Sequence, residues 1–98
     1  MSGLKLMTAW VCPPPGETLP EAGEGLEGLM RAFYQAFPEY EGCLRAFQAP
    51  RAPRHVFVYV ARDCSGLLPW AGEHLRGLLA GLFPQAEVRA YGKAWVEA

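Results

Sequence analysis

His74 carries a side chain suited to acid–base chemistry, because an imidazole group titrates near neutral pH and can donate a proton or bind a metal. Trp70 precedes it by four residues, so in a helix the two side chains share one flank. A covered tryptophan at that position indicates the rim of a cavity or an interface. The alternative, that His74 is only a border residue of an amphipathic helix, stays open.

His55 follows Arg54 at the predicted start of a strand, where a histidine more often belongs to a solvated edge than to a catalytic site. Neither histidine has a second His, Cys, Asp or Glu at the spacing of metal ligands, so we predict no metal site. The glutamates between residues 17 and 27 fit a solvated helix face whose negative charge suits a helix N-terminus.

Cys12, Cys43 and Cys64 are odd in number and widely spaced, which argues against a disulfide framework and against a Cys-x-x-Cys site. We therefore predict buried free thiols. Cys64 lies between Asp63 and Ser65 at a predicted strand-to-helix junction, where helix amides can activate a thiol. The carboxylate of Asp63 opposes that effect, and Ser65 is better explained as a helix cap.

Small and bulky side chains alternate in two segments of the second half of the chain. Val56, Val58 and Val60 interleave with His55, Phe57 and Tyr59, and residues 87–96 repeat the pattern with Tyr91 and Trp95 among the bulky positions. Alternate residues of a strand face opposite sides of a sheet. The pattern predicts a sheet with one small, dry face and one aromatic face.

Periodicity and turn residues predict six elements in the order βαββαβ. The strands are expected at 4–12, 42–49, 54–62 and 87–96. The first helix is expected after a capping box at Thr18 and Glu21 and ends before Pro38. The second opens at Ser65 or Leu68 and ends at Phe83. This is the order of the ferredoxin-like α+β fold, a four-stranded antiparallel sheet with both helices on one face.

The large apolar residues of the helices pack best on the small face of the sheet, so the aromatic side chains face away from both helices. Six such rings expose on the order of 1,000 Å² in total, more than monomers usually leave uncovered. We therefore predict a homodimer formed through this face. Its interface residues are Trp10, Phe47, Tyr59, Tyr91 and Trp95, and Phe57 is the sixth ring of the face.

Composition indicates one domain, residues 1–98, with a net charge of −1 that gives no general attraction to nucleic acid. No apolar run approaches the ~18 residues of a membrane helix, and residues 1–8 do not resemble a secretion signal, so we expect a cytoplasmic protein with no membrane partner. Arginine exceeds lysine, and asparagine and isoleucine are absent, a composition typical of GC-rich genomes and compatible with a thermophile.

Several segments resemble the dimeric α+β barrel superfamily, and within it the antibiotic biosynthesis monooxygenase-like domains. The resemblance is carried by Pro38 followed by the run 42–45 (GCLR), the Pro-containing turn 50–53, the strand 55–63 (HVFVYVARD) and the pair His74 and Leu75. It implies a homodimer with two sheets packed face to face, and a cavity in each subunit between the sheet and its helices.

The resemblance also implies a ligand and a chemistry. Some members oxidise polyketide-like aromatics without a cofactor, and others degrade haem, using an asparagine on the sheet, a tryptophan and, for haem, a histidine of the second helix. This chain has no asparagine, and Trp70 and His74 are the nearest counterparts. The expected pocket adds Phe33 and Phe57 and binds a small apolar, aromatic or haem-like compound, and a reaction there would be oxygen-dependent and cofactor-free. His74 would handle a proton and Trp70 would orient the substrate.

Two alternatives belong to other classes. A regulatory or structural dimer without catalysis explains the sequence as well as an enzyme does. A single-stranded RNA-binding module shares the element order, and Phe57 and Tyr59 have the spacing of base-stacking residues. However, that strand lacks the preceding Arg/Lys-Gly-Phe motif and the first strand offers no stacking aromatic in residues 4–7, so nucleic acid is not expected.

Overall fold

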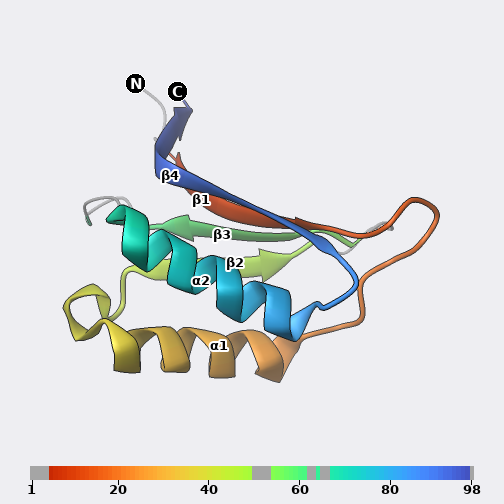
Figure 1. Cartoon of the computed structure of the whole chain (residues 1–98), viewed down its shortest axis with the longest axis horizontal. Coiled ribbons are helices and arrows are strands. Elements are labelled where there is room, and N and C mark those ends of the chain that lie inside the picture. The colour runs from red at the N-terminus through yellow and green to blue at the C-terminus, as the bar shows by residue number, and fades with distance from the viewer. Residues whose placement is uncertain (1–4, 50–53, 62–63, 65–66, 98) are drawn as a thin grey trace.

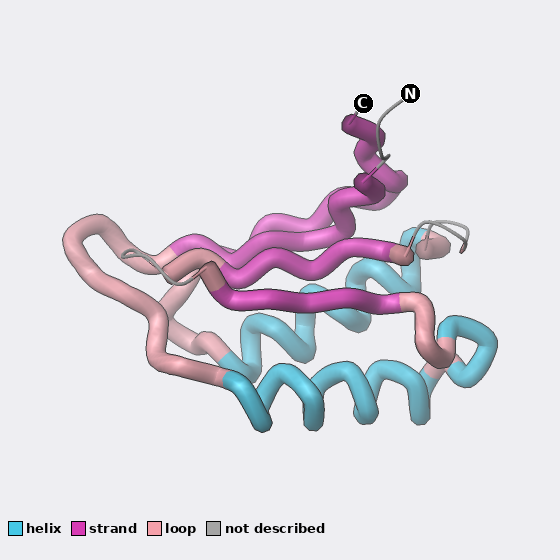
Figure 2. The backbone as a smooth tube through the Cα atoms, turned by 180° about the vertical axis from the view of Figure 1, so that it is seen from behind, coloured by secondary structure: helices cyan, strands magenta, loops and turns pink. Residues whose placement is uncertain are grey.

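The computed structural model describes residues 5–49, 54–61, 64 and 67–97. Its elements are β1 (Lys5–Cys12), α1 (Gly23–Ala36), the short 3-10 helix η1 (Pro38–Tyr40), β2 (Leu44–Gln48), β3 (Val56–Val60), α2 (Pro69–Leu82) and β4 (Glu87–Glu97). The strands form one antiparallel sheet in the order β2-β3-β1-β4, and both helices lie on the same side of it (Figures 1 and 2). The predicted α+β class is confirmed.

The small residues of the sheet face the helices. Val56, Val58 and Val60 of β3 and Ala9 and Val11 of β1 are buried in one core. The helices contribute the large members of this core, including Phe33, Leu75 and Leu79. Small side chains on the sheet let the helix axes approach closely enough for these large ones to fill the space. The orientation predicted from the alternating pattern is therefore confirmed for β3, and Val88 of β4 also packs against this core.

The two helices lie side by side, and they face different parts of the sheet. α2 packs over β4 and β1, and α1 lies beside α2 (Figure 2). Tyr34 of α1 reaches the start of β2, where its hydroxyl accepts a hydrogen bond from the backbone N–H of Leu44 at 3.0 Å. Tyr40 of η1 similarly accepts one from the N–H of Leu68, the residue before α2. The hydroxyls of Tyr34 and Tyr40 therefore hydrogen-bond α1 and η1 to the start of β2 and to the residue before α2.

The predicted capping box of the first helix is wrong. α1 begins at Gly23, and its N-cap residue Ala22 makes no side-chain cap. The segment before it is not helical, and in it Leu19 enters the core. The N–H of Ala22 instead donates to the side-chain oxygen of Gln48 at 3.1 Å, and the Gln48 amide donates to the carbonyl of Pro20 at 2.8 Å. Gln48 of β2 thus supplies the hydrogen-bond acceptor at the start of α1 that a local capping side chain would otherwise provide.

Gln48→Ala is expected to lower the free energy of unfolding by about 1–2 kcal/mol, because it removes both hydrogen bonds and leaves the partly buried Ala22 N–H without its acceptor. Urea denaturation measures the loss. Gln35→Ala on the exposed surface of α1 is the matched control, and it should change stability by less than about 0.5 kcal/mol. Equal effects of the two variants would contradict a structural role for Gln48.

The cysteine prediction is wrong for two of the three residues. Cys43 and Cys64 form a disulfide, with their Cα atoms 5.9 Å apart, and Cys12 is a free cysteine. The hairpin and a turn explain the pairing: Leu44 of β2 lies opposite Val60 of β3, so Cys43 is next to Ala61, and the N–H of Cys64 donates to the carbonyl of Ala61 at 3.0 Å. The N–H of Ala61 donates to the carbonyl of Cys43 at 2.7 Å. Antiparallel pairing brings together cysteines that are 21 residues apart in sequence.

Candidate functional site

A cluster of rings lies on the side of the sheet opposite the helices. We call it the aromatic face, and it consists of Trp10 on β1, Phe47 on β2, Phe57 and Tyr59 on β3, and His55 directly before β3. Strand register explains the cluster, because Phe57 is the cross-strand partner of both Trp10 and Phe47. Three neighbouring strands thereby place one row of rings across the sheet.

Phe57 is the centre of this cluster. Its ring stacks on Phe47 with the centroids 5.2 Å apart and on His55 at 6.2 Å, and it meets the edge of Trp10 at 6.3 Å. Tyr59 contacts Phe47 edge-on at 6.4 Å. Such pairs contribute about 0.5–1.5 kcal/mol each beyond their burial, so the rings hold one another in place. Phe47 nevertheless keeps 45% of its surface exposed, and the other rings are half-buried.

Arginines lie at the margins of the aromatic face. The Arg89 guanidinium lies 5.8 Å from the centre of the Trp10 ring and pairs with Glu87 at 3.2 Å. Arg45 donates to the carbonyls of Gly42 and Leu44 at 2.7 and 2.9 Å. Both cations are therefore held by groups of their own strand or turn. Two predicted interface residues, Tyr91 and Trp95, are on β4, but their side chains lie outside what the structure describes.

The residues predicted to line a catalytic pocket do not meet in one cavity. Trp70, in the first turn of α2, is 61% exposed, and His74 is exposed one turn later. The His74 ring lies 5.3 Å from that of Phe37 and 6.4 Å from that of Phe33. Phe33 is fully buried in the core, whereas Phe57 is on the other side of the sheet. The structure thus brings the rings of His74 and Phe33 near each other and places Phe57 on the opposite side of the sheet, while Trp70 is exposed in the first turn of α2.

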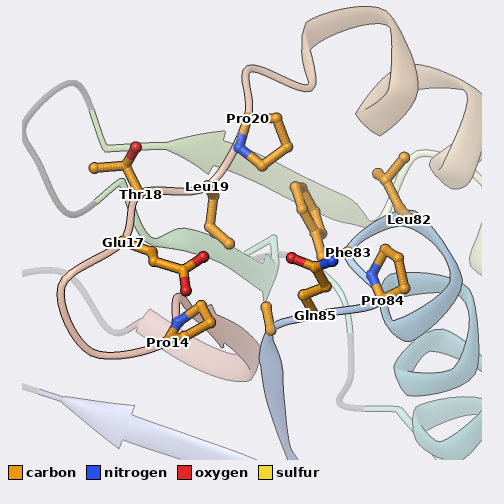
Figure 3. Close-up of a pocket in the computed structure, with 10 residues that line it drawn as sticks. Pro14, Glu17, Thr18, Leu19, Pro20, Leu82, Phe83, Pro84 and Gln85 are labelled. Atoms are coloured by element: carbon orange, nitrogen blue, oxygen red, sulfur yellow. The ribbon is translucent and has the colours of Figure 1, made fainter.

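A pocket of about 220 Å³ lies at the end of the helix layer, between the loop after β1 and the connection from α2 to β4 (Figure 3). Leu19 and Phe83, both buried, and three prolines form most of its wall, and Glu17 and Gln85 supply polar groups. Sequence reasoning missed this pocket. The signal in the sequence that could have indicated it is the pair of proline-containing segments at 13–15 and Pro84, because prolines stiffen the backbone on both sides of the pocket.

No group of three or more His, Cys, Asp or Glu side chains within the described ranges could hold a metal ion. In the same ranges no helix has both the length and the apolar character needed to cross a membrane. Comparison of the chain with protein-family models, with curated proteins and with solved structures finds no match.

Proposed function

We propose that this chain is a homodimeric α+β barrel protein with ferredoxin-like topology, in which two aromatic faces pack against each other, and that it binds a small apolar or aromatic compound. The observation that carries the proposal is the aromatic face itself. A row of rings across three strands, with Phe47 45% exposed, is an apolar surface of the kind that marks a partner site on a soluble protein.

The strand order supports the topology. In the order β2-β3-β1-β4 the first and third strands are central, which is the arrangement that two interleaved βαβ units give. The central strands carry Trp10, Phe57 and Tyr59, so these three rings lie at the middle of the sheet, and Phe47 extends the face onto the edge strand β2. A face centred in this way can contact its own copy around a two-fold axis, since the same residues meet from both sides.

The charges of this face also suit a second copy as partner. Glu87 pairs with Arg89, and carbonyl oxygens of the turn accept from Arg45. Glu87 therefore balances the charge of Arg89, whereas the carbonyl oxygens satisfy the hydrogen-bond donors of Arg45 without neutralising its charge. Aromatic residues and arginine are the residue types that contribute most to interfaces between proteins.

Binding is better supported than oxidation. A proton donor for an oxygen-dependent reaction works in a site that excludes water, whereas His74 and Trp70 are both exposed on α2. Oxidation of a bound aromatic compound, with His74 as proton donor and Trp70 as orienting residue, is the catalytic alternative. A regulatory or structural dimer is the alternative without a ligand.

Phe47→Arg is expected to weaken the dimer roughly 30-fold or more, because it places a charge among the rings. This factor corresponds to a loss of about 2 kcal/mol in binding free energy, which is typical of removing a residue that contributes strongly to an interface. Sedimentation equilibrium of the wild-type chain and the variant measures the association constant. Leu68→Arg is the matched control: Leu68 is 44% exposed, almost the same as Phe47, but it precedes α2 on the helix side.

The control variant should dimerise like the wild type. A wild-type chain that stays monomeric at all concentrations, or a dimer broken by Leu68→Arg and not by Phe47→Arg, would refute this interface. In the monomeric case the stacked Phe47 and Phe57 would be available to nucleic-acid bases. Retention of single-stranded RNA that falls steeply with salt would then favour the RNA-binding alternative.

A further inference from the structure

We propose that the pocket between the loop after β1 and the α2–β4 connection is a binding site for a small primary amine with an apolar body, such as an arylalkylamine. This site is independent of the proposed dimer, because its walls include no residue of the aromatic face. Trp70 and His74 do not line this pocket, because they are in the first half of α2 and the pocket is at its C-terminal end. The ligand is therefore expected at the opposite end of α2 from these two residues.

The pocket has a rigid apolar body. Leu19 and Phe83 form its floor and are members of the buried core, so their positions are set by the packing of the whole domain. Pro14, Pro20 and Pro84 form its sides, and a proline ring limits backbone motion. A ligand that enters therefore orders few side chains, which lowers the entropic penalty of binding. Its volume, about 220 Å³, is below the ~300–1,000 Å³ of sites for drug-sized molecules, which limits the ligand to a small compound.

A tight turn positions the acidic group of the pocket. The N–H of Glu17 donates to the carbonyl of Pro14 at 3.0 Å, and Gly16 has a φ of +79°. Proline at the second position and glycine with positive φ at the third are the signature of a type II turn, here Pro14–Glu17. This turn therefore holds Glu17 at the pocket.

The polar groups select a cation. Glu17 is the only charged side chain among the described lining residues, and no basic side chain in the described part of the chain pairs with its carboxylate. Gln85 lines the opposite side and offers an amide oxygen, and Leu19 lies between them in the close-up (Figure 3). An ammonium group carries three donors and no acceptor, so it matches a carboxylate together with an amide oxygen. An anionic ligand would be repelled by the carboxylate of Glu17.

Phenethylamine is a suitable probe, and amide chemical shifts of the ¹⁵N-labelled chain report its binding. Saturable shifts are expected at Leu19, Gln85 and Ala86, which line the pocket. Glu17→Gln should weaken the binding about tenfold, since a charge-assisted contact becomes a neutral one. Glu24→Gln is the matched control, because Glu24 is an exposed glutamate in the first turn of α1 and does not line the pocket.

The uncharged analogue 2-phenylethanol separates recognition of charge from simple burial of a ring. It should bind the wild type about as weakly as phenethylamine binds the Glu17→Gln variant, and phenylacetate should bind more weakly still. Absence of saturable shifts at the pocket residues, equal binding of the amine and the alcohol, or equal effects of the two glutamate substitutions would each overturn the assignment. A monomeric chain would not, since the aromatic face takes no part in this site.

Discussion

Phe33→Ala is expected to lower the free energy of unfolding by about 3–5 kcal/mol, the range for removing a fully buried phenylalanine ring. The side chain is 0% exposed, and its ring lies 5.3 Å from that of Phe37 and 6.0 Å from that of Tyr40. Deleting it leaves a cavity where α1 meets η1 and the flank of α2, and those elements cannot all move inward to fill the space. Urea denaturation followed by far-UV circular dichroism measures the loss.

Phe47→Ala is the matched control for this prediction, because it makes the same chemical change on the opposite side of the sheet. Phe47 is 45% exposed, so its truncation should lower the stability of one folded subunit by about 1 kcal/mol or less. Both variants are compared at one protein concentration, since dimerisation would add a concentration-dependent term. If Phe33→Ala destabilised the chain no more than Phe47→Ala, the core described between helices and sheet would be wrong.

Replacing Cys43 and Cys64 together with serine is expected to lower the free energy of unfolding by about 3 kcal/mol, because the unfolded chain loses the closure of a loop of about 20 residues. In a domain of this size that loss corresponds to a fall in melting temperature of roughly 12–24 °C. Thermal unfolding with and without a reductant measures it. The wild type should be sensitive to the reductant, and the double variant should not.

Cys12→Ser is the matched control, since Cys12 is on β1 and is a free cysteine. It should change the melting temperature little, and the variant should keep the response to the reductant. Thiol titration of the denatured, unreduced wild type is expected to find one thiol per chain. Three thiols would show that the disulfide is absent and would remove the reason for the predicted loss of stability.

The disulfide bears on where the protein works. Disulfides persist in oxidising compartments, and inside cells they are a regular feature mainly of hyperthermophiles. The Cys43–Cys64 bond therefore gives no support to the cytoplasmic location predicted from the sequence, which stays a prediction.

Local features of the sequence were sufficient for most elements. Alternation of Val56, Val58 and Val60 with aromatic residues determined which side of β3 enters the core, because side-chain direction in a strand follows directly from the backbone. The observed strand ends lie within two residues of the predicted ones. The predicted opening at Leu68 is confirmed, because Leu68 is the N-cap of α2 and Pro69, whose fixed φ and missing N–H suit a first helical position, is its first residue. The other predicted start, Ser65, lies outside the described residues.

The tertiary structure alone decided the features that depend on residues far apart in the chain. The start of α1 depends on Gln48, 26 residues after Ala22, so the local match of Thr18 and Glu21 to a capping box was misleading. The disulfide depends on the register of β2 against β3, and the pocket depends on two proline-rich segments that meet only after α2 has packed on the sheet. Spacing along the chain carries information about neighbours within a turn or a strand, whereas these contacts are set by how the elements pack.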